Sequence, residues 1–119
     1  MVKIGNPIFN TTIYRLRKAS AKGRYKIWEA AAEYLLKHRS KRPCVNVGKI
    51  SKLTKSGDKV LVPGKVLGGG IINHNVIVGA YSFTNSAKSK ILKAGGEALH
   101  ILEFMDRYPD GSGVILIGG

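Results

Sequence analysis

The sequence contains few acidic residues, a single cysteine and no long apolar run. Of its 119 residues, seven are Asp or Glu and one is Cys. One thiol cannot form an intramolecular disulfide, which argues against a disulfide-dependent secreted protein and favours a reducing, cytoplasmic setting. Apolar stretches such as 76–81 are far shorter than the roughly 20 residues of a membrane-spanning helix. No apolar segment with a small-residue cleavage site follows Met1, so we expect no secretory signal.

Acidic residues are fewest, relative to basic ones, in residues 1–65. This segment has 16 Lys and Arg against Glu29, Glu33 and Asp58, and it carries the whole net charge of +13. Residues 66–119 are neutral, with four basic and four acidic side chains. Solubility needs only a modest charge of mixed sign spread over the surface. A surplus confined to one segment therefore indicates a polyanionic partner, and many phosphate contacts would make the binding strongly dependent on salt.

The length predicts a single structural domain, and the order of helical and strand patterns along the chain predicts a mixed α/β (α+β) fold. A chain of this length buries roughly two-thirds of the surface of its unfolded form, and a hydrophobic share of 44% is ordinary for a globular protein. Within that domain we expect two parts. Residues 1–44 are predicted to be a basic, helical RNA-binding extension packed on the core, and residues 45–119 to be a compact α/β core.

Two helices are predicted in the extension. The first begins with an N-cap and a proline at the first helical position, Asn6-Pro7, and ends near residues 19–20. A basic turn at 22–24 separates it from the second helix, over residues 25–38, whose apolar residues recur at helical spacing. Pro43 then stops any further helix, since it cannot extend the hydrogen-bond ladder.

The core is predicted to alternate short strands with turns. Apolar runs at 45–50, 59–62 and 71–83 are separated by turn residues at 56–58, 63–64 and 68–70. Two further strands are expected at 98–101 and 114–117, with a local helix or turn at 103–107 and a turn at 109–111.

One helix is predicted inside the core. Thr84 or Asn85 caps it and Gly95 ends it. Ala87 and Ile91, with Leu92 as a further candidate, would form its buried stripe. Its lysines are expected to face outward: Lys88, Lys90 and Lys93.

The basic clusters are the candidate nucleic-acid contacts. A solvated charged surface is the alternative, but such a surface normally mixes acids with bases. The candidate RNA-binding residues are Arg15, Arg17, Lys18, Lys22, Arg24, Lys26, Lys37, Arg39, Lys41, Arg42, Lys49, Lys52, Lys55 and Lys65. The arginines are the strongest candidates because a guanidinium binds phosphate bidentately. Tyr14 and Tyr25 could stack on unpaired bases, whereas Trp28 and Tyr34 are expected in the core. The basic tract 37–43 also has the composition of a nuclear address, a weaker interpretation.

No active site, metal site or cofactor site is predicted. The glycine-rich segment 64–70 fails the P-loop pattern, because Lys59 occupies the required glycine position and Val66 that of the hydroxyl. Its glycines allow close approach to an RNA backbone or to a neighbouring strand. The three histidines have no ligands at metal-binding spacing. Cys44 is interpreted as a buried apolar residue at the start of a strand, with a reactive thiol as the alternative.

Three segments resemble a known family. They are Val45-Asn46-Val47-Gly48-Lys49-Ile50, the run DKVLVPGKVLG at 58–68, and Phe83-Thr84-x-Ser86-Ala87-x-x-Lys90-Ile91-x-x-Ala94-Gly95-Gly96. Together with the Asn6-Pro7 start and the glycines after Pro109, they resemble the L-fifteen / L-eighteen-e family of large-subunit (50S) ribosomal proteins, in its shorter archaeal form. One departure from the family is Pro43-Cys44, where a more basic or polar pair is expected.

The resemblance implies a fold and a function. The fold would consist of irregular β-β-α turns preceded by a helical N-terminal extension. The function would be non-catalytic binding of large-subunit ribosomal RNA, beside neighbouring ribosomal proteins and without a small-molecule substrate. A chromatin-type DNA-binding protein and a small basic ribonuclease are the alternatives from other classes.

Overall fold

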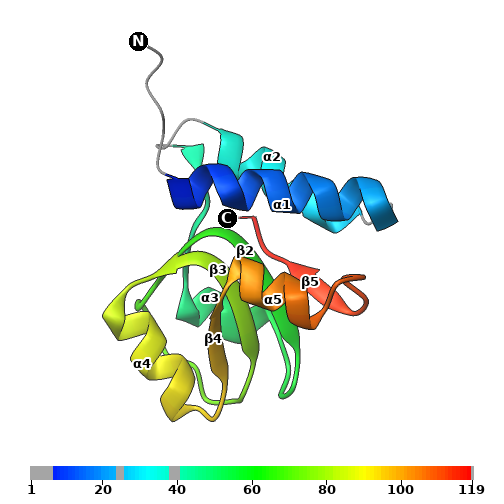
Figure 1. Ribbon diagram of the computed structural model, residues 1–119. Helices are drawn as coiled ribbons and strands as arrows, with labels where there is room; N and C mark the ends of the chain where they lie inside the picture. Colours follow the sequence, from blue (N-terminus) through cyan, green and yellow to red (C-terminus); the bar gives the residue numbers. More distant parts are fainter. Residues whose placement is uncertain (1–6, 24–25, 38–40, 119) are drawn as a thin grey trace.

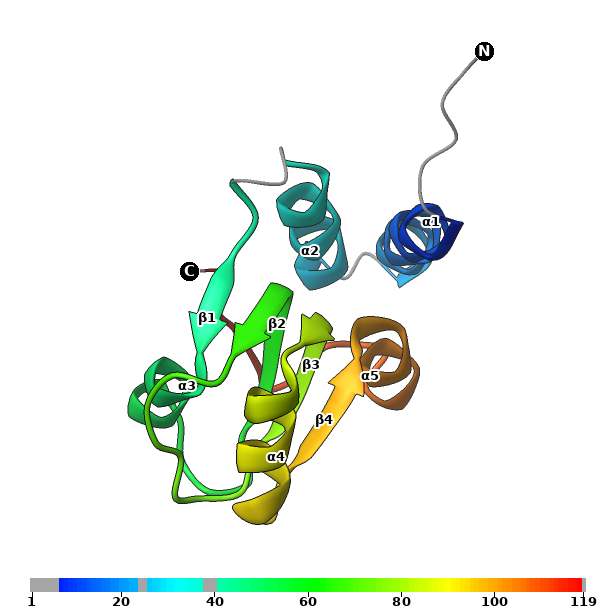
Figure 2. The ribbon, with the colours of Figure 1, turned by 90° about the vertical axis from the view of Figure 1, so that its left-hand side faces the viewer.

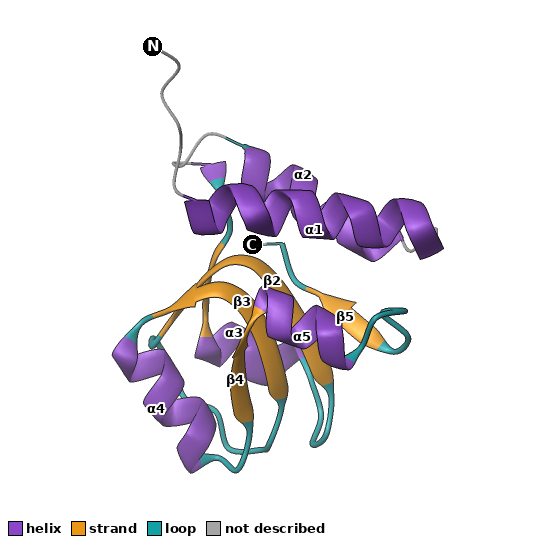
Figure 3. Cartoon of the chain, in the orientation of Figure 1, coloured by secondary structure: helices purple, strands orange, loops and turns teal. Residues whose placement is uncertain are grey.

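A five-stranded parallel sheet lies between two layers of helices (Figure 1). The computed structural model describes residues 7–23, 26–37 and 41–118. The elements in chain order are α1 (Pro7–Gly23), α2 (Lys26–Leu36), β1 (Cys44–Asn46), α3 (Val47–Leu53), β2 (Lys59–Leu67), β3 (Ile77–Phe83), α4 (Asn85–Lys93), β4 (Glu97–His100), α5 (Ile101–Arg107) and β5 (Val114–Leu116). Helices are interspersed among the strands of the core, with β2 and β3 consecutive, as Figure 3 shows by colour, so the predicted mixed α/β class is confirmed.

Strand β2 is the centre of the sheet. One of its edges pairs with β3, and its other edge is shared by β5 at residues 59–61 and by β1 at residues 65–67. The register against β3 shifts between Val62 and Lys65. The turn predicted at Pro63-Gly64 is therefore wrong. Proline has no N–H to donate to a neighbouring strand. Strand β2 accommodates Pro63 as a local irregularity, at the point where its partner on the other edge changes from β5 to β1.

The side chains of β2 enter two separate cores. Val60 and Val62 pack on one side with residues of α3 and α4. Leu61 points to the other side and packs with residues of α1, α2 and α5. All three side chains are fully buried. A strand buried on both faces is typical of a parallel sheet covered by helices, and it appears in the sequence as a continuous apolar run.

Helices α1 and α2 are anchored to the sheet by large buried side chains. Leu16 of α1 and Trp28 and Leu35 of α2 have no exposed surface. The indole Nε1 of Trp28 donates a hydrogen bond to the carbonyl of Pro109 at 2.7 Å, and the indole lies edge-on to Phe104 with 6.4 Å between ring centroids. Each such side chain contributes about 1.5–3 kcal/mol relative to an exposed one. The basic helix α1 and helix α2 are thus part of the folded core.

The helix boundaries in the basic segment differ from the prediction. Helix α1 continues to Gly23, so the predicted turn at 22–24 begins within its last residues, and Arg15, Arg17 and Lys18 lie in its interior turns. Helix α2 ends at Leu36, and the predicted extension to His38 falls outside the described residues. Among the described residues, no helix is long and apolar enough to cross a membrane.

The apolar run 45–50 contains two elements where one strand was predicted. Strand β1 ends at Asn46, which has an extended backbone and is the N-cap of α3. Val47 and Ile50, three residues apart, bury the same face of that helix. A short apolar run cannot distinguish a strand from a buried helical turn by spacing alone. The prediction that Cys44 is buried is also wrong: the cysteine begins β1 as expected, but its side chain is exposed.

Helix α4 begins and ends as predicted. The Thr84 hydroxyl accepts a hydrogen bond from the backbone N–H of Ala87 at 3.2 Å, and Gly95 follows the helix with a positive φ of 87°. Ala87 and Ile91 are buried. Leu92 is 56% exposed and does not belong to the buried stripe.

Gly79 on β3 allows α5 to lie directly on the sheet. A Cβ at this position would overlap the ring of Phe104. We predict that Gly79→Ala lowers the free energy of unfolding by about 1–3 kcal/mol through overpacking, measured by urea denaturation. The same substitution in a Phe104→Ala background tests the cause, because alanine lacks the Cγ and Cδ2 atoms that a Cβ at position 79 would overlap, and the absence of the ring should reduce the penalty. An undiminished penalty there would contradict the assignment.

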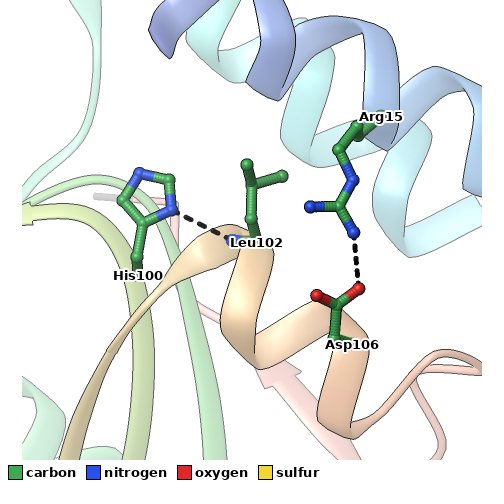
Figure 4. A network of polar contacts seen from close by, with 4 residues as sticks. All are labelled: Arg15, His100, Leu102 and Asp106. Atoms are coloured by element: carbon green, nitrogen blue, oxygen red, sulfur yellow. Dashed lines mark hydrogen bonds and ion pairs between the residues drawn. The ribbon is translucent and has the colours of Figure 1, made fainter.

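His100 is the N-cap of α5, and its imidazole Nδ1 accepts a hydrogen bond from the backbone N–H of Leu102 at 3.2 Å (Figure 4). Burial lowers the pKa of His100 from the ordinary value of 6.5, and the nearby Glu103 opposes this shift more weakly. Tyr81 also faces the imidazole, with ring centroids 5.7 Å apart.

We predict that protonation of His100 destabilises the fold. The pKa of His100 is lower in the folded than in the unfolded protein. The stabilisation that depends on the neutral imidazole is therefore fully present above pH 6.5 and is lost as the pH falls below that value. Urea denaturation between pH 5 and 8 measures the effect. His100→Asn keeps a capping acceptor without this titration and should flatten the pH dependence; equal slopes for the two proteins would refute the prediction.

Candidate nucleic-acid interface

The predicted contact residues are distributed over both helical layers. Described side chains on or next to α1 and α2 are Arg15, Arg17, Lys18, Lys26, Lys37, Lys41 and Arg42. Those on or next to α3 and β2 are Lys49, Lys52, Lys55 and Lys65. Lys22 lies in the last turn of α1, but its side chain is outside the described part, as are Arg24 and Arg39 altogether. The structure therefore separates the cations on or next to α3 from those on or next to α1 and α2, and Lys65 of β2 lies at one groove with Arg42.

Helix α1 presents cations and one aromatic ring on its outer face. Arg17 and Lys18 are exposed, while Leu16, just before them, is buried. Tyr14 is 64% exposed, and the Lys18 ammonium lies 5.7 Å from its ring centroid. Tyr14 is thus accessible for stacking, as the sequence suggested. Trp28 is fully buried, as predicted for a core residue.

Arg15 already has an acidic partner within the protein. Its Nη2 donates to the Asp106 carboxylate at 2.6 Å, joining α1 to α5 (Figure 4). Both side chains are well exposed, at 39% and 61%, so the ion pair adds little to stability. It does hold the guanidinium toward α5, which makes Arg15 a weaker candidate for a phosphate contact than Arg17.

Arg42 also has contacts within the protein. Its guanidinium lies 4.5 Å from the ring centroid of Phe9 on α1, and its Nε donates to the carbonyl of Lys37 at 3.4 Å. These contacts hold the segment after α2 against α1. Arg42 therefore has a structural role besides any contact with RNA.

A groove of about 370 Å³ lies where this segment enters β1. Its lining residues are Leu35, Arg42, Pro43, Cys44, Gly64, Lys65, Tyr81 and Ser82. The carbonyl of Pro43 accepts a hydrogen bond from the backbone N–H of Lys65 at 3.0 Å, and the Lys65 side chain is exposed. Pro43-Cys44, the pair that departs from the resembled family, thus contributes a backbone contact, while Arg42 and Lys65 supply the cations at this groove.

Helix α3 places Lys49 and Lys52 on the surface beside a second groove, of about 730 Å³, that also borders the glycine-rich loop. Lys55 follows the helix and is exposed. Its backbone N–H donates to the Asp58 carboxylate at 2.8 Å, so this acid stabilises the turn before β2.

The glycine-rich loop packs against the start of α3. Gly48 N–H donates to the Gly69 carbonyl at 2.9 Å, and Gly69 N–H donates to Oδ1 of Asn46 at 2.9 Å. Gly70 has a φ of +86°, and a Cβ there would meet the Gly48 backbone. Gly48, Gly69 and Gly70 thus allow two backbone segments of the protein to pack closely.

Lys90 of α4 holds the same loop from the other side. Its ammonium donates to the carbonyl of Gly68 at 2.6 Å and to that of Gly70 at 2.8 Å. The prediction that Lys90 faces outward is therefore wrong. The contact joins residues 20 or more positions apart, and lysine spacing within the helix could not reveal it.

A further ion pair lies in residues 66–119. Arg107 binds both carboxylate oxygens of Glu97 at 2.9 and 3.0 Å, and this hydrogen bonding raises the pKa of Arg107. Across the residues that the structure describes, no three His, Cys, Asp or Glu side chains gather as a possible metal site. The arrangement thus offers exposed cations on rigid helices, which suits an extended polyanion.

Comparison with known proteins gives a consistent assignment. Residues 14–119 match the family described as "Ribosomal protein 60S L18 and 50S L18e". Three archaeal relatives carry the name large ribosomal subunit protein eL18. The protein of Pyrobaculum aerophilum is 45% identical over 102 residues, covering 86% of this chain and 84% of the relative. That of Archaeoglobus fulgidus is 46% identical over 112 residues, covering 94% and 96%. That of Methanosphaerula palustris is 41% identical over 116 residues, covering 98% and 96%. The chain belongs to the 60S L18 and 50S L18e family of ribosomal proteins.

Proposed function

We propose that this protein is a structural, non-catalytic constituent of the large ribosomal subunit in the cytoplasm, and that it binds large-subunit ribosomal RNA through its basic segment. Family membership supports the first part, because the relatives are named as large-subunit proteins. The observation that carries the second part is the set of exposed cations on, or just after, the two helices that pack on the sheet. We call it the α1–α2 surface: Arg17, Lys18, Lys26, Lys37 and Lys41.

The mechanism is electrostatic and architectural. Cations on the α1–α2 surface neutralise phosphates of RNA segments that would otherwise repel one another, and release of condensed counterions favours the complex. The buried faces of α1 and α2 hold these cations in place, so the RNA meets a surface of fixed shape. Contacts of this kind position RNA without reading its bases. Shape and backbone recognition suits folded RNA, whose deep major groove is poorly accessible to side chains.

The two parts of the chain have different roles in this proposal. Residues 1–44 act as the RNA-binding extension, with cations outward and apolar side chains against the sheet. Residues 45–119 form the core that supports them and offer surface to neighbouring large-subunit proteins. The exposed ring of Tyr14 lies within the basic face of α1, where an unpaired base could stack on it.

Loss of two cations from the α1–α2 surface should weaken RNA binding and its salt dependence. For Arg17→Gln/Lys26→Gln, we predict a slope of log affinity against log salt that is less steep by about one unit per lost contact. Filter binding to deproteinised archaeal large-subunit ribosomal RNA at several salt concentrations measures it, with duplex DNA as competitor.

Lys59→Gln is the matched control. The Lys59 ammonium lies 4.7 Å from the Tyr108 ring centroid and near Gly113, and Lys59 is not part of the α1–α2 surface. This variant should bind RNA with the slope of the unaltered protein. A double variant that keeps the original slope, or binding that duplex DNA displaces as well as RNA does, would count against the proposal. Co-sedimentation of the tagged protein with large subunits in a sucrose gradient tests the assignment to the ribosome.

A further inference from the structure

The charges of residues 66–119 sum to zero, but they are unevenly distributed along this segment. All four acids of residues 66–119 lie at or after Glu97, whereas three of its four cations, Lys88, Lys90 and Lys93, precede it. Between residues 34 and 96 the only acid is Asp58, against twelve Lys and Arg. The zero net charge of residues 66–119 is therefore the sum of an entirely basic α4 and an acidic C-terminal part.

The fold brings α4 beside the basic helix α3. Both helices pack on the same core, through Val47 and Ile50 of α3 and Ala87 and Ile91 of α4. Figure 2 shows them on one side of the sheet, with α1 and α2 on the other. The outward-facing charges of this pair of helices are the exposed lysines Lys49, Lys52, Lys88 and Lys93.

The acids nearest in sequence to this pair are already engaged. Glu97, just after α4, binds Arg107 through both carboxylate oxygens. Asp58, just after α3, accepts a backbone N–H within its own turn. The recorded partners of both carboxylates are thus groups other than Lys52, Lys88 and Lys93.

A rigid loop with an apolar tip lies between the two helices. The loop, residues 68–73, is held by Asn46 and Gly48 on one side and by the Lys90 ammonium on the other. Ile71 at its tip is 70% exposed. A groove of about 320 Å³ bordered by Lys93 lies on one side of Ile71, and the groove of about 730 Å³ bordered by Lys49 and Lys52 lies on the other.

We propose that α3, this loop and α4 form a second RNA-binding surface, so that the protein bridges two RNA segments across its sheet. We call it the α3–α4 surface: Lys49, Lys52, Ile71, Lys88 and Lys93. The inference rests on the proposed function and extends it to α4 and the loop. It assigns the lysines the role of phosphate contacts and places Ile71 against the sugars exposed in a shallow minor groove.

RNA is the occupant that the observations favour. The surface has cations on both sides of an apolar tip and two open grooves, which matches an anionic backbone on either side of a ribose edge. The sheet separates it from the α1–α2 surface, and screening at physiological salt acts over about 8 Å. The two surfaces therefore attract RNA independently, and each can hold a different segment.

Two variants test the surface by binding to deproteinised archaeal large-subunit ribosomal RNA. Lys88→Gln/Lys93→Gln should reduce the slope of log affinity against log salt by about one unit per lost contact. Ile71→Ser should weaken binding with the slope unchanged, since it removes apolar contact and no charge. Lys59→Gln is again the control. Circular dichroism and urea denaturation confirm that each variant is folded.

The outcomes separate this inference from the proposed function. If Arg17→Gln/Lys26→Gln lowers the slope but Lys88→Gln/Lys93→Gln does not, the α1–α2 surface binds RNA and the second surface is refuted. That result would instead leave the α3–α4 surface to an acidic protein neighbour. If neither double variant changes the slope, the proposed function fails as well.

Directed hydroxyl-radical cleavage tests the bridging itself. In a Cys44→Ser background, iron chelates are attached to single cysteines introduced by Asn10→Cys on α1, Ser89→Cys on α4 and Ser112→Cys before β5, all at exposed positions. The α1 and α4 probes should cleave two distinct sets of RNA positions. The third probe lies next to Gly111, which packs against Ile27 of α2, so it should share positions with the α1 probe and not with the α4 probe. Absence of cleavage by the α4 probe, or cleavage at the same positions as by the α1 probe, would overturn the bridge.

Discussion

Burial of the apolar faces of α1 and α2 against β2 and α5 is the interaction on which the rest of this structure depends. The basic segment carries a charge that would favour an expanded chain through self-repulsion. Leu16, Trp28 and Leu35 counter this by packing with Leu61 and Phe104 in one core. The cations are then held on the outer faces of fixed helices. An unfolded basic tail would present the same charge, but it would lose conformational freedom on binding.

Elements with local chemical markers could be predicted from the sequence. Helix α4 has a threonine cap, a buried pair at helical spacing and a terminal glycine, and the structure has all three. The elements that the sequence misidentified depend on contacts between distant residues. Pro63-Gly64 resembles a turn locally, yet parallel neighbours on both edges keep β2 continuous. The exposure of Cys44 follows from its place on the outermost strand, which no local pattern indicates.

The candidate site shows the same limit. Charge counting identified the exposed cations of α1 and α2, because a helix with one apolar face directs its lysines and arginines outward. It could not identify Asp106 as the partner of Arg15, since 91 positions separate them. It also assigned the α4 lysines to a neutral half, because the net charge of a sequence segment contains no information on which helices lie next to each other in the fold. The bonds from Lys90 to the glycine loop depend on the folded sheet in the same way.

The hydrogen bond from Trp28 to Pro109 spans 81 positions of the chain. Helices α1 and α2 leave the translating ribosome well before α5 and the turn that follows it. Their docking surface is incomplete until those residues have been synthesised, so the apolar faces of α2 and of the strongly basic helix α1 remain uncovered for most of translation. Such a nascent chain is prone to aggregate or to adhere to any nearby nucleic acid. The fold therefore makes prompt shielding by a chaperone advantageous during biosynthesis.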